Sequence, residues 1–308
     1  YIEKVWNTYT KILGDTESGS KLYMSLYFDI AGTGITYEYK NYDQKYYIPT
    51  LAGAPIGFRE GNSTLASRNN HAINWGDEVG HQIELNRAIG NLNWLGNLSF
   101  SHIHDSKNKF SDILSTNLNV LKNNESLENY SLYPFRQIYS EVSGYTCKDK
   151  FYFKLGVDQL DKVKLYYSFF QETTAFTLPT MFTYSLGGGN SITSYIEYQN
   201  KEVSLMSPDL SIINTDFYLQ KYLSLTYNYS NFISFSLFYE DETHEDSINE
   251  TSETDIWQGY DITAKLNSTS QFSVFYGSQK GGLVCANGVC AEQPGFDDGI
   301  KVTLRTIF

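Results

Sequence analysis

The sequence lacks any long apolar run. No stretch approaches the roughly eighteen consecutive apolar residues that a transmembrane helix needs. This absence excludes a helical span but leaves a membrane barrel open, because a closed barrel also satisfies every backbone polar group within lipid. The sequence begins at Tyr1 with neither a Met nor a signal-like apolar segment. We therefore expect a mature form or a piece of a longer chain.

Basic residues are scarce and scattered. Lys and Arg number 23 against 35 Asp and Glu, which gives a formal net charge of -12. A nucleic-acid partner needs clustered Lys and Arg to contact its phosphates, and no such cluster occurs, so nucleic acid is excluded as a partner. Linkers rich in Pro, Ser or Gly are also missing from the sequence, and we predict a single domain over residues 1–308.

Recognisable catalytic and cofactor motifs are missing as well. The five histidines offer few general bases, and none lies beside a Ser in a known motif. The absence of Cys-x-x-Cys-His excludes covalent haem attachment. We predict that the protein is not an enzyme and uses no cofactor.

Metal-ligating residue types occur in several places without a dedicated spacing. His102 and His104 would share one face of a strand, and His71 and His81 flank an acidic pair. The acidic segment 240–255 lacks the regular Asp-x-Asp-x-Asp-Gly spacing of a calcium loop. We favour ordinary polar residues and a solvated loop over metal binding at these places, and predict no metal site.

Aromatic residues, by contrast, are abundant, with 26 Tyr and 19 Phe. Although 41% of the residues are hydrophobic, the mean hydropathy is -0.38, so apolar and polar residues must be mixed evenly. Strict alternation achieves this, and residues 21–30 show it, with one face formed by Leu22, Met24, Leu26, Phe28 and Ile30. Such alternation predicts β-strands, in either a soluble sandwich or a membrane barrel.

The lengths of the connections distinguish these two folds. Short turns are expected at 31–34, 89–91, 146–148, 186–190, 228–231 and 267–270. They alternate with long polar segments at 43–77, 105–132, 202–214, 241–255 and 281–297. Short turns on one side and long loops on the other are typical of outer-membrane barrels. We therefore predict an all-β transmembrane antiparallel β-barrel with short periplasmic turns and long extracellular loops.

The same alternation of connections decides the strand count. Residues 162–171 alternate well, but a spanning strand there would put the long segments of the two halves of the chain on opposite sides. We therefore predict that 159–175 form a hairpin extension or loop above the membrane. Spanning strands are expected near 1–13, 21–30, 34–43, 78–88, 92–104, 135–145, 149–158, 176–185, 191–201, 215–228, 232–240, 256–266, 271–280 and 298–308. The total is about fourteen, an even number as in single-chain bacterial barrels.

Three cysteines are present. Cys285 and Cys290 lie close together in a Gly-rich segment, and Cys147 is alone. The short loop between the pair can close as a disulfide in an oxidising compartment, and we predict this bond. Two free thiols are the alternative.

The final strand alternates up to the last residue of the sequence. This ending resembles the insertion signal of bacterial outer-membrane β-barrel proteins, which the barrel-assembly machinery reads. The matching residues are Ile300, Val302, Leu304, Thr306 and Phe308. The resemblance implies insertion into outer-membrane lipid, with the terminal ring at the level of the inner headgroups.

A second resemblance extends over most of the chain. It rests on PTLAGAPIGFREGNSTLASRNNHAINWGDEVGHQIELN, on YPFRQIYSEVSGY, and on the Gly-rich segment that holds the cysteine pair. These stretches resemble the loop and strand pattern of an uncharacterised family of outer-membrane barrels from Bacteroidota and their relatives. The resemblance implies a porin-like barrel at the cell surface, and it supplies no enzymatic residues.

The polar faces of the strands carry the remaining candidate residues. We predict a lumen lined by Glu38, Lys40, Gln82, Glu84, Asn86, Lys154, Glu197, Gln199, Gln220, Lys265, Lys301 and Arg305. Such mixed charges are compatible with a water-filled pore for small hydrophilic solutes. They are equally compatible with a lumen that is closed by its own loops and by Lys–Glu pairs.

Two functions follow from these alternatives. The first is a porin-like channel for small hydrophilic solutes. The second is a non-conducting structural barrel in a larger cell-surface complex, whose long loops 43–77 and 105–132 bind partner proteins. Apolar loop residues such as Ile73 and Trp75 suit packing against a partner, and they suit an inward-folded plug equally well.

Overall fold

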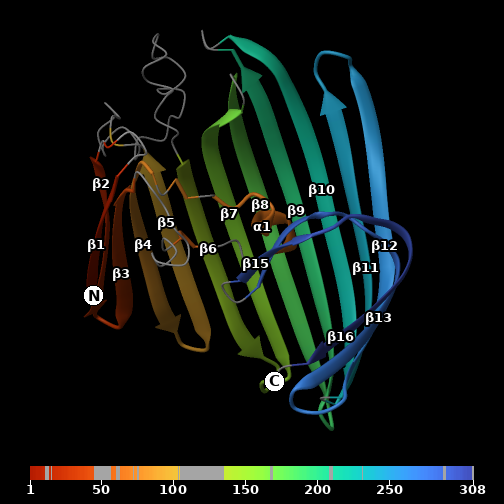
Figure 1. Ribbon diagram of the computed structural model, residues 1–308. Helices are drawn as coiled ribbons and strands as arrows, with labels where there is room; N and C mark the ends of the chain where they lie inside the picture. The colour runs from red at the N-terminus through yellow and green to blue at the C-terminus, as the bar shows by residue number, and fades with distance from the viewer. Residues whose placement is uncertain are drawn as a thin grey trace.

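The computed structural model describes most of the chain (Figure 1). The described residues are 1–10, 14, 16–44, 57–59, 63–71, 73–74, 76–102, 104, 135–166, 169–207, 211–230, 232–286 and 289–306. For residues 165–166, 283–286 and 289–293 the description covers the backbone without the side chains.

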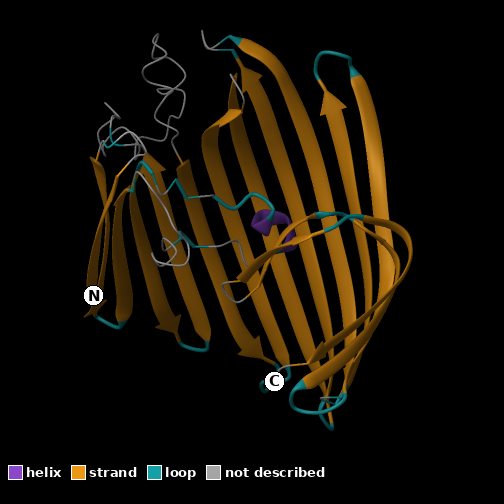
Figure 2. Ribbon diagram, in the orientation of Figure 1, coloured by secondary structure: helices purple, strands orange, loops and turns teal. Residues whose placement is uncertain are grey.

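Fourteen strands form one antiparallel sheet, in which neighbours in sequence are neighbours in space. In order they are β1 (Ile2–Thr10), β2 (Thr16–Ile30), β3 (Thr33–Asp43), β4 (Glu78–Ile89), β5 (Leu92–His102), β6 (Phe135–Thr146), β7 (Phe151–Tyr166), β8 (Phe169–Gly187), β9 (Asn190–Met206), β10 (Ile212–Tyr229), β11 (Ile233–Asp246), β12 (Thr251–Lys265), β13 (Ser270–Gln279) and β16 (Phe296–Thr306). The sheet curves into a barrel wall (Figure 2). The predicted fold class and strand count are confirmed.

Two small elements accompany the sheet. A separate two-stranded hairpin, β14 (Gly282–Ala286) and β15 (Val289–Gln293), lies between β13 and β16 in sequence. A short helix, α1 (Thr64–Ser67), lies between β3 and β4. No helix in the described part of the chain is long and apolar enough to cross a membrane.

The two faces of the sheet differ in chemistry because successive residues of a strand point to opposite sides. The outer face carries exposed apolar side chains, among them Phe28, Ile138, Leu155, Ile196, Leu223, Leu225, Phe235, Leu237, Ile262 and Val302. The inner face carries buried polar side chains, among them Lys40, Gln82, Asn97, Gln137, Glu197, Gln199, Gln220 and Glu240. This distribution is the reverse of that in a soluble protein and is typical of a wall between lipid and a polar interior.

The exposed apolar side chains of the outer face form a band with visible limits, which we call the apolar band. On the side of the long connections, two ion pairs interrupt the band on the outer face, Arg136 Nη2–Asp161 Oδ2 at 2.8 Å and Lys221 Nζ–Asp241 Oδ1 at 3.3 Å, and Phe217 is exposed beyond the second pair. On the other side it reaches the short turns, where Tyr229 is exposed. A lipid-facing band bounded by polar groups and aromatic rings is expected of a membrane barrel.

The short connections lie at one end of the sheet. The turns after β2, β4, β6, β8, β10 and β12 are all tight, and they share one end because alternate strands run in opposite directions (Figure 1). Several use left-handed backbone conformations, for example Ala31 and Gly32 with φ values of 51° and 75°. The predicted short turns are confirmed, whereas at the opposite end the connections after β3, β5 and β13 are long and those after β9 and β11 are short.

Two segments that we predicted as long polar connections, 202–214 and 241–255, prove to be mostly strand. Segment 202–214 is shortened because β9 runs to Met206 and β10 begins at Ile212. Segment 241–255 is a continuation of β11 and β12, which pair up to Asp246 and Thr251. For segment 159–175 the first of the two predicted alternatives is confirmed, because its described residues extend the β7–β8 hairpin. The β7, β8 and β9 extensions share a buried apolar cluster of Val163, Phe170 and Met206. In 241–255 neither face is apolar, and alternation in the sequence therefore underestimates the extension of β11 and β12.

The sheet has two edges, β1 and β16, and no pairing between them is found among the described strands. Ile300, Val302 and Leu304 of β16 lie on the outer face and are exposed. Thr306 pairs with Ser270 at the end of this strand. Phe308, the last residue of the predicted insertion signal, lies outside the described residues.

Candidate functional site

Part of the long β3–β4 connection packs against the inner face of the wall. We call its described residues 57–59 and 63–71 the inserted segment. Its helix α1 contacts β9, β10 and β14, and Figure 2 shows the helix on the inner side of the sheet, about halfway along the strands. The inserted segment is therefore the feature that most directly shapes the interior.

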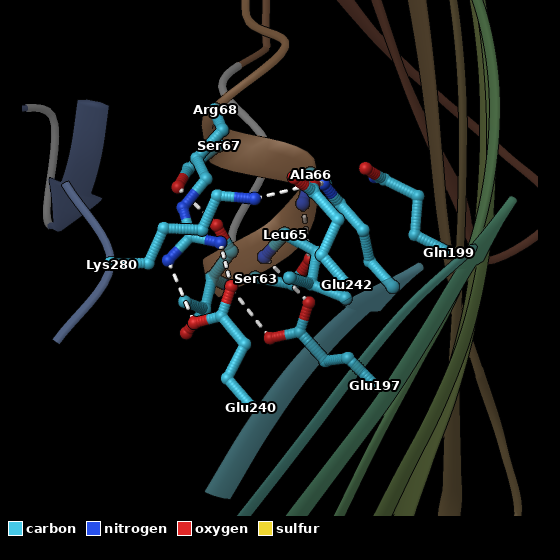
Figure 3. A network of polar contacts seen from close by, with 12 residues as sticks. Ser63, Leu65, Ala66, Ser67, Arg68, Glu197, Gln199, Glu240, Glu242 and Lys280 are labelled. Atoms are coloured by element: carbon cyan, nitrogen blue, oxygen red, sulfur yellow. Dashed lines mark hydrogen bonds and ion pairs between the residues drawn. The ribbon is translucent and has the colours of Figure 1, made fainter. Parts of the chain in front are cut away.

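The first anchor of the inserted segment is the start of α1 (Figure 3). The backbone N–H groups of Thr64 and Leu65 donate to Glu197 Oε1 and Oε2 at 2.6 and 2.8 Å. The Ser63 hydroxyl accepts from Ala66 N at 3.2 Å as the N-cap. The first N–H groups of a helix have no partner within it, and a carboxylate that accepts two of them is a strong charge-assisted acceptor.

The second anchor is formed by the residues that follow α1. Arg68 makes a two-point ion pair with Glu240, in which Nη1 donates to Oε1 and Nη2 donates to Oε2 at 3.0 Å. Asn69 Nδ2 donates to Gln199 Oε1 at 3.0 Å, and Lys162 Nζ donates to the carbonyl of Asn69 at 2.7 Å. These partners come from β7, β9 and β11, so one turn of helix is tied to a wide arc of the wall.

The third anchor lies at residues 57–59, against β3 and β4. Lys40 Nζ donates to the carbonyl of Gly57, and Arg59 N donates to Gln82 Oε1 at 2.8 Å. The Arg59 guanidinium pairs with Glu84 at 3.1 Å and lies over the ring of Tyr139. A guanidinium held by both a carboxylate and an aromatic face has little freedom to move.

Aromatic packing closes the gap between the anchors. The rings of Phe58 and Phe135 are 5.1 Å apart, and the His71 ring stacks on Phe135 at 4.2 Å. Phe58, Phe135 and Leu160 form a small buried apolar cluster. Beyond it, Glu78 accepts from Asn74 N at 2.6 Å and contacts His71 Nε2 at 3.2 Å.

A small cavity lies beside α1. Its volume is about 90 Å³, and it is lined by Ser63, Ala66, Tyr139, Lys154, Asp158 and Tyr195, among others. Lys154 Nζ pairs with Glu141 at 2.8 Å, and Asp158 accepts from Gln137 Nε2 at 2.8 Å. The cavity holds only a few water molecules, since each takes about 30 Å³ in the liquid.

The structure places the predicted lumen residues on one face, but their contacts and their exposure differ. Several touch the inserted segment directly: Lys40, Gln82, Glu84, Glu197 and Gln199. Others lie on the same face and pair with neighbouring wall residues: Glu38, Lys154 and Gln220. The rest share the register of this face and are exposed: Asn86, Lys265, Lys301 and Arg305.

Several residues of this site were missed by sequence reasoning. They are the anchors supplied by the loop and their wall partners: Arg59, Ser63, Arg68, Asn69, Lys162 and Glu240. Glu240 was assigned to an acidic loop, whereas it is a wall residue that binds Arg68. A usable signal did exist, because Ser63-Thr64 before Leu65-Ala66 has the form of a helix N-cap.

The predicted disulfide falls on residues whose side chains are not described. The backbone register places Cys285 opposite Cys290 in the β14–β15 hairpin. Cys147 is a free, exposed thiol in the turn after β6. The bond between Cys285 and Cys290 stays a prediction.

Two further predictions concern loop 105–132 and the histidines. Loop 105–132 lies outside the described residues. His104 Nδ1 contacts Asp77 Oδ1 at 2.5 Å and its Nε2 contacts Asn41 Oδ1 at 3.0 Å. Within the described ranges there is no group of three or more His, Cys, Asp or Glu that could hold a metal ion.

Comparisons with known proteins give only distant similarities. No family model matches the chain, and no curated protein matches it. Among solved structures, the chain is similar to OmpT, an outer membrane protein of Vibrio cholerae, with 11% identity and a TM-score of 0.47 over 99% of this chain and 94% of that one. It is also similar to the FrpB iron transporter from Neisseria meningitidis, with 10% identity and a TM-score of 0.47 over 92% of this chain and 46% of that one.

A third similarity is to the ferric citrate transporter FecA in its unliganded form. The identity is 8% and the TM-score is 0.43, over 91% of this chain and 44% of that one. With identities this low and TM-scores below 0.5, none of these similarities assigns a function to the chain.

Proposed function

We propose that this protein is a porin-like outer-membrane β-barrel that passes small hydrophilic solutes, and that the inserted segment narrows its lumen. The observation that carries the proposal is the combination of an apolar outer band with a polar inner face. An apolar band suits contact with outer-membrane lipid, and a polar inner face suits water and small polar solutes. Insertion by the barrel-assembly machinery belongs to the same proposal.

The inserted segment supports restricted rather than free passage. It is held by charged groups from β3, β4, β7, β9 and β11. It spans from the Lys40 side of the wall to the Glu240 side, and the cavity beside α1 holds only a few waters. The inserted segment therefore leaves little free space between α1 and this part of the wall, which supports a narrowed lumen.

A second candidate is a non-conducting structural barrel whose long connections bind partner proteins. The anchoring of the inserted segment favours this candidate, because a firmly held segment on the inner face suits a closed lumen. The same anchoring turns this part of loop 43–77 inward, away from a partner outside. Partner binding by the rest of that loop and by loop 105–132 is part of this second proposal, as is the resemblance to a Bacteroidota-type family.

The first test is single-channel conductance of the detergent-purified protein in planar bilayers. The informative variant is the double substitution Arg59→Ala and Arg68→Ala, which removes one charged anchor at each end of the inserted segment. Lys221→Ala is the matched control, because it removes a positive charge from the outer face. We expect small open steps in the unmodified protein, larger steps in the double variant, and no change in the control.

Each of the other outcomes indicates a different function for the barrel. A silent unmodified protein with a conducting double variant indicates a plugged channel. Silence in both contradicts the channel proposal and favours the structural barrel. Equal steps in all three proteins would mean that the inserted segment does not limit passage.

A further inference from the structure

One strand of the wall is paired on one side only. β12 pairs with β11 along nearly its whole length, from Asp246–Thr251 to Ile233–Ala264. Its pairing with β13 begins only at Gly259–Gly277 and continues to Lys265–Gln271. Residues 251–258, which we call the β12 edge, therefore have no strand partner on that side among the described pairings.

The divergence begins at a close contact between two glycines. A Cβ atom on Gly277 would lie 2.2 Å from the carbonyl oxygen of Gln258 and 2.6 Å from Gly259 Cα, and its φ is 132°. Only glycine allows this approach. Just beyond it, the register of β13 with β16 shifts between Gly277 and Gln279, so β13 leaves β12 at this point.

The chain after β13 is drawn toward the interior. Lys280 Nζ pairs with Glu242, β14 contacts α1, and Figure 1 shows the β14–β15 hairpin leaving the wall. The contact that remains across the gap is a hydrogen bond from Gln258 N to Ser278 Oγ at 3.1 Å. Backbone groups of alternate residues above Gln258, such as those of Ile256 and Thr254, point into the same gap because strand periodicity repeats every two residues.

The gap is a groove of about 660 Å³. The residues that line it include the aromatic Trp257, Tyr260 and Tyr276 and the acidic Asp255, Asp297 and Asp298. The charged residues that line it are all acidic. The groove starts beside Ile256, whose cross-strand neighbour Asp241 belongs to an ion pair that interrupts the apolar band, so the β12 edge continues into the aqueous side.

We propose that the β12 edge binds an extended, basic peptide segment of a partner protein by strand addition. Unpaired backbone donors and acceptors on a sheet edge match an extended peptide. The three carboxylates match Lys or Arg at alternate positions, and the aromatic rings accept their alkyl chains and cationic heads. The chain itself provides a model for this contact, since Lys280 Nζ lies 5.0 Å from the centre of the Trp257 ring and pairs with Glu242.

Charge excludes a second copy as the favoured occupant. The β12 edge of another copy would bring Glu253 and Asp255 against the same carboxylates, with no basic residue between 251 and 258. Like charges directly opposite in a sheet are destabilising. A basic strand removes this repulsion.

The test uses the full-length protein in detergent and fluorescent peptides, with binding followed by fluorescence anisotropy. The probe is Lys-Val-Lys-Val-Lys-Val, and the charge control is Glu-Val-Glu-Val-Glu-Val. A third peptide keeps the basic sequence but carries N-methyl groups on alternate backbone nitrogens, which removes the edge hydrogen bonds. We expect the basic peptide to bind at least about tenfold more tightly than either control, a difference of about 1.4 kcal/mol.

Two variants locate the binding. Thr254→Pro removes a backbone donor from the edge and leaves every carboxylate, whereas Thr254→Val is its matched control. The triple substitution Asp255→Asn, Asp297→Asn and Asp298→Asn removes the charge and leaves the edge. We expect about tenfold weaker binding for the proline and triple variants and unchanged binding for the valine variant.

Several results would overturn the proposal. Equal binding of the N-methylated peptide would mean attraction to the overall negative charge without strand addition, and this result is independent of how well any variant folds. Absence of binding by the basic peptide would reject the proposed partner chemistry. A dimer of the unmodified protein that Thr254→Pro dissociates would replace the partner with a second copy.

Discussion

Two regions of the inner face have the same alternation and opposite surroundings. On β3 and β9, Lys40 and Glu197 are 0% and 1% exposed. On β12 and β16, Lys265, Lys301 and Arg305 occupy the same face by register and are exposed. The difference is the inserted segment, which makes hydrogen bonds to Lys40 and Glu197 in the first region. The register of a strand thus decides which face a side chain lies on. Its burial depends on whether another segment packs over that face.

In the covered region, charged side chains are buried with polar partners beside a small apolar cluster of Phe58, Phe135 and Leu160. Burying an isolated charge is costly, and a buried charge is tolerated when a well-placed opposite charge or several hydrogen bonds accompany it. Lys40, Arg68 and Glu197 each satisfy this condition. The exposed region needs no such partners because water solvates its charges.

The largest expected effect comes from breaking the Arg68–Glu240 pair on one side. Glu240→Leu leaves the Arg68 guanidinium, which is only 13% exposed, without its carboxylate. We expect the free energy of unfolding to fall by about 3 kcal/mol, measured by urea unfolding in detergent with tryptophan fluorescence. The double variant Glu240→Leu and Arg68→Met should lose much less, and an equal loss in both would contradict the burial argument.

A smaller effect is expected when the first anchor is weakened without removing a side chain. Glu197→Gln replaces one acceptor oxygen with an NH₂ group that faces the N–H of Thr64 or Leu65. We expect a loss of about 1 to 3 kcal/mol in docking of the inserted segment, seen as faster protease cleavage within residues 57–71. Glu3→Gln, at a partly exposed pair with Lys21, serves as the control and should leave the cleavage rate unchanged.

The pH dependence of docking of the inserted segment tests the covered region without a mutation. Burial, assisted by the positive charges of Lys164 and Lys201, lowers the pKa of Lys162 to about 8 from its ordinary value of 10.5. Lys162 lies beyond the apolar band and donates to the inserted segment. The docked state therefore binds fewer protons than the released state between these two values, and docking strengthens as the pH rises through this window.

The measurement is conductance between about pH 7 and pH 10. We expect smaller or fewer open steps as the pH rises, because Lys162 opposes docking fully below a pH of about 8 and progressively less above it. Lys162→Met should flatten this dependence. Conductance that increases with pH would show that a different group controls docking.

The smallest effect is expected in the exposed region. Lys301→Ala and Arg305→Ala should each change the free energy of unfolding by no more than about 0.5 kcal/mol. The same urea titration measures them beside Glu240→Leu. A loss as large as that of Glu240→Leu would mean that the inner face of β16 is covered in the membrane in the way that β9 is.

The β11–β12 hairpin extension shows where strand ends cannot be predicted from the sequence. Strand ends within the apolar band were predicted within a few residues, as at β3 and β4. In 241–255 both faces are polar, so this segment had no apolar alternation to follow, although β11 and β12 continue through it. Backbone hydrogen bonds alone extend these strands, and such bonds leave little trace in residue type.

By itself, the sequence determined the antiparallel sheet of fourteen strands, the end at which the short turns lie, and the face on which each strand residue falls. These features are local, because a two-residue period and the turn residues specify them. Only the tertiary structure decided that part of the β3–β4 connection packs inward, that Glu197 and Glu240 bind it, and that β12 is left with an open edge. The first two features depend on contacts between residues more than a hundred positions apart, as between Leu65 and Glu197, and no local pattern encodes such contacts. The third depends on the close approach of Gly277 to Gln258, which lie on different strands.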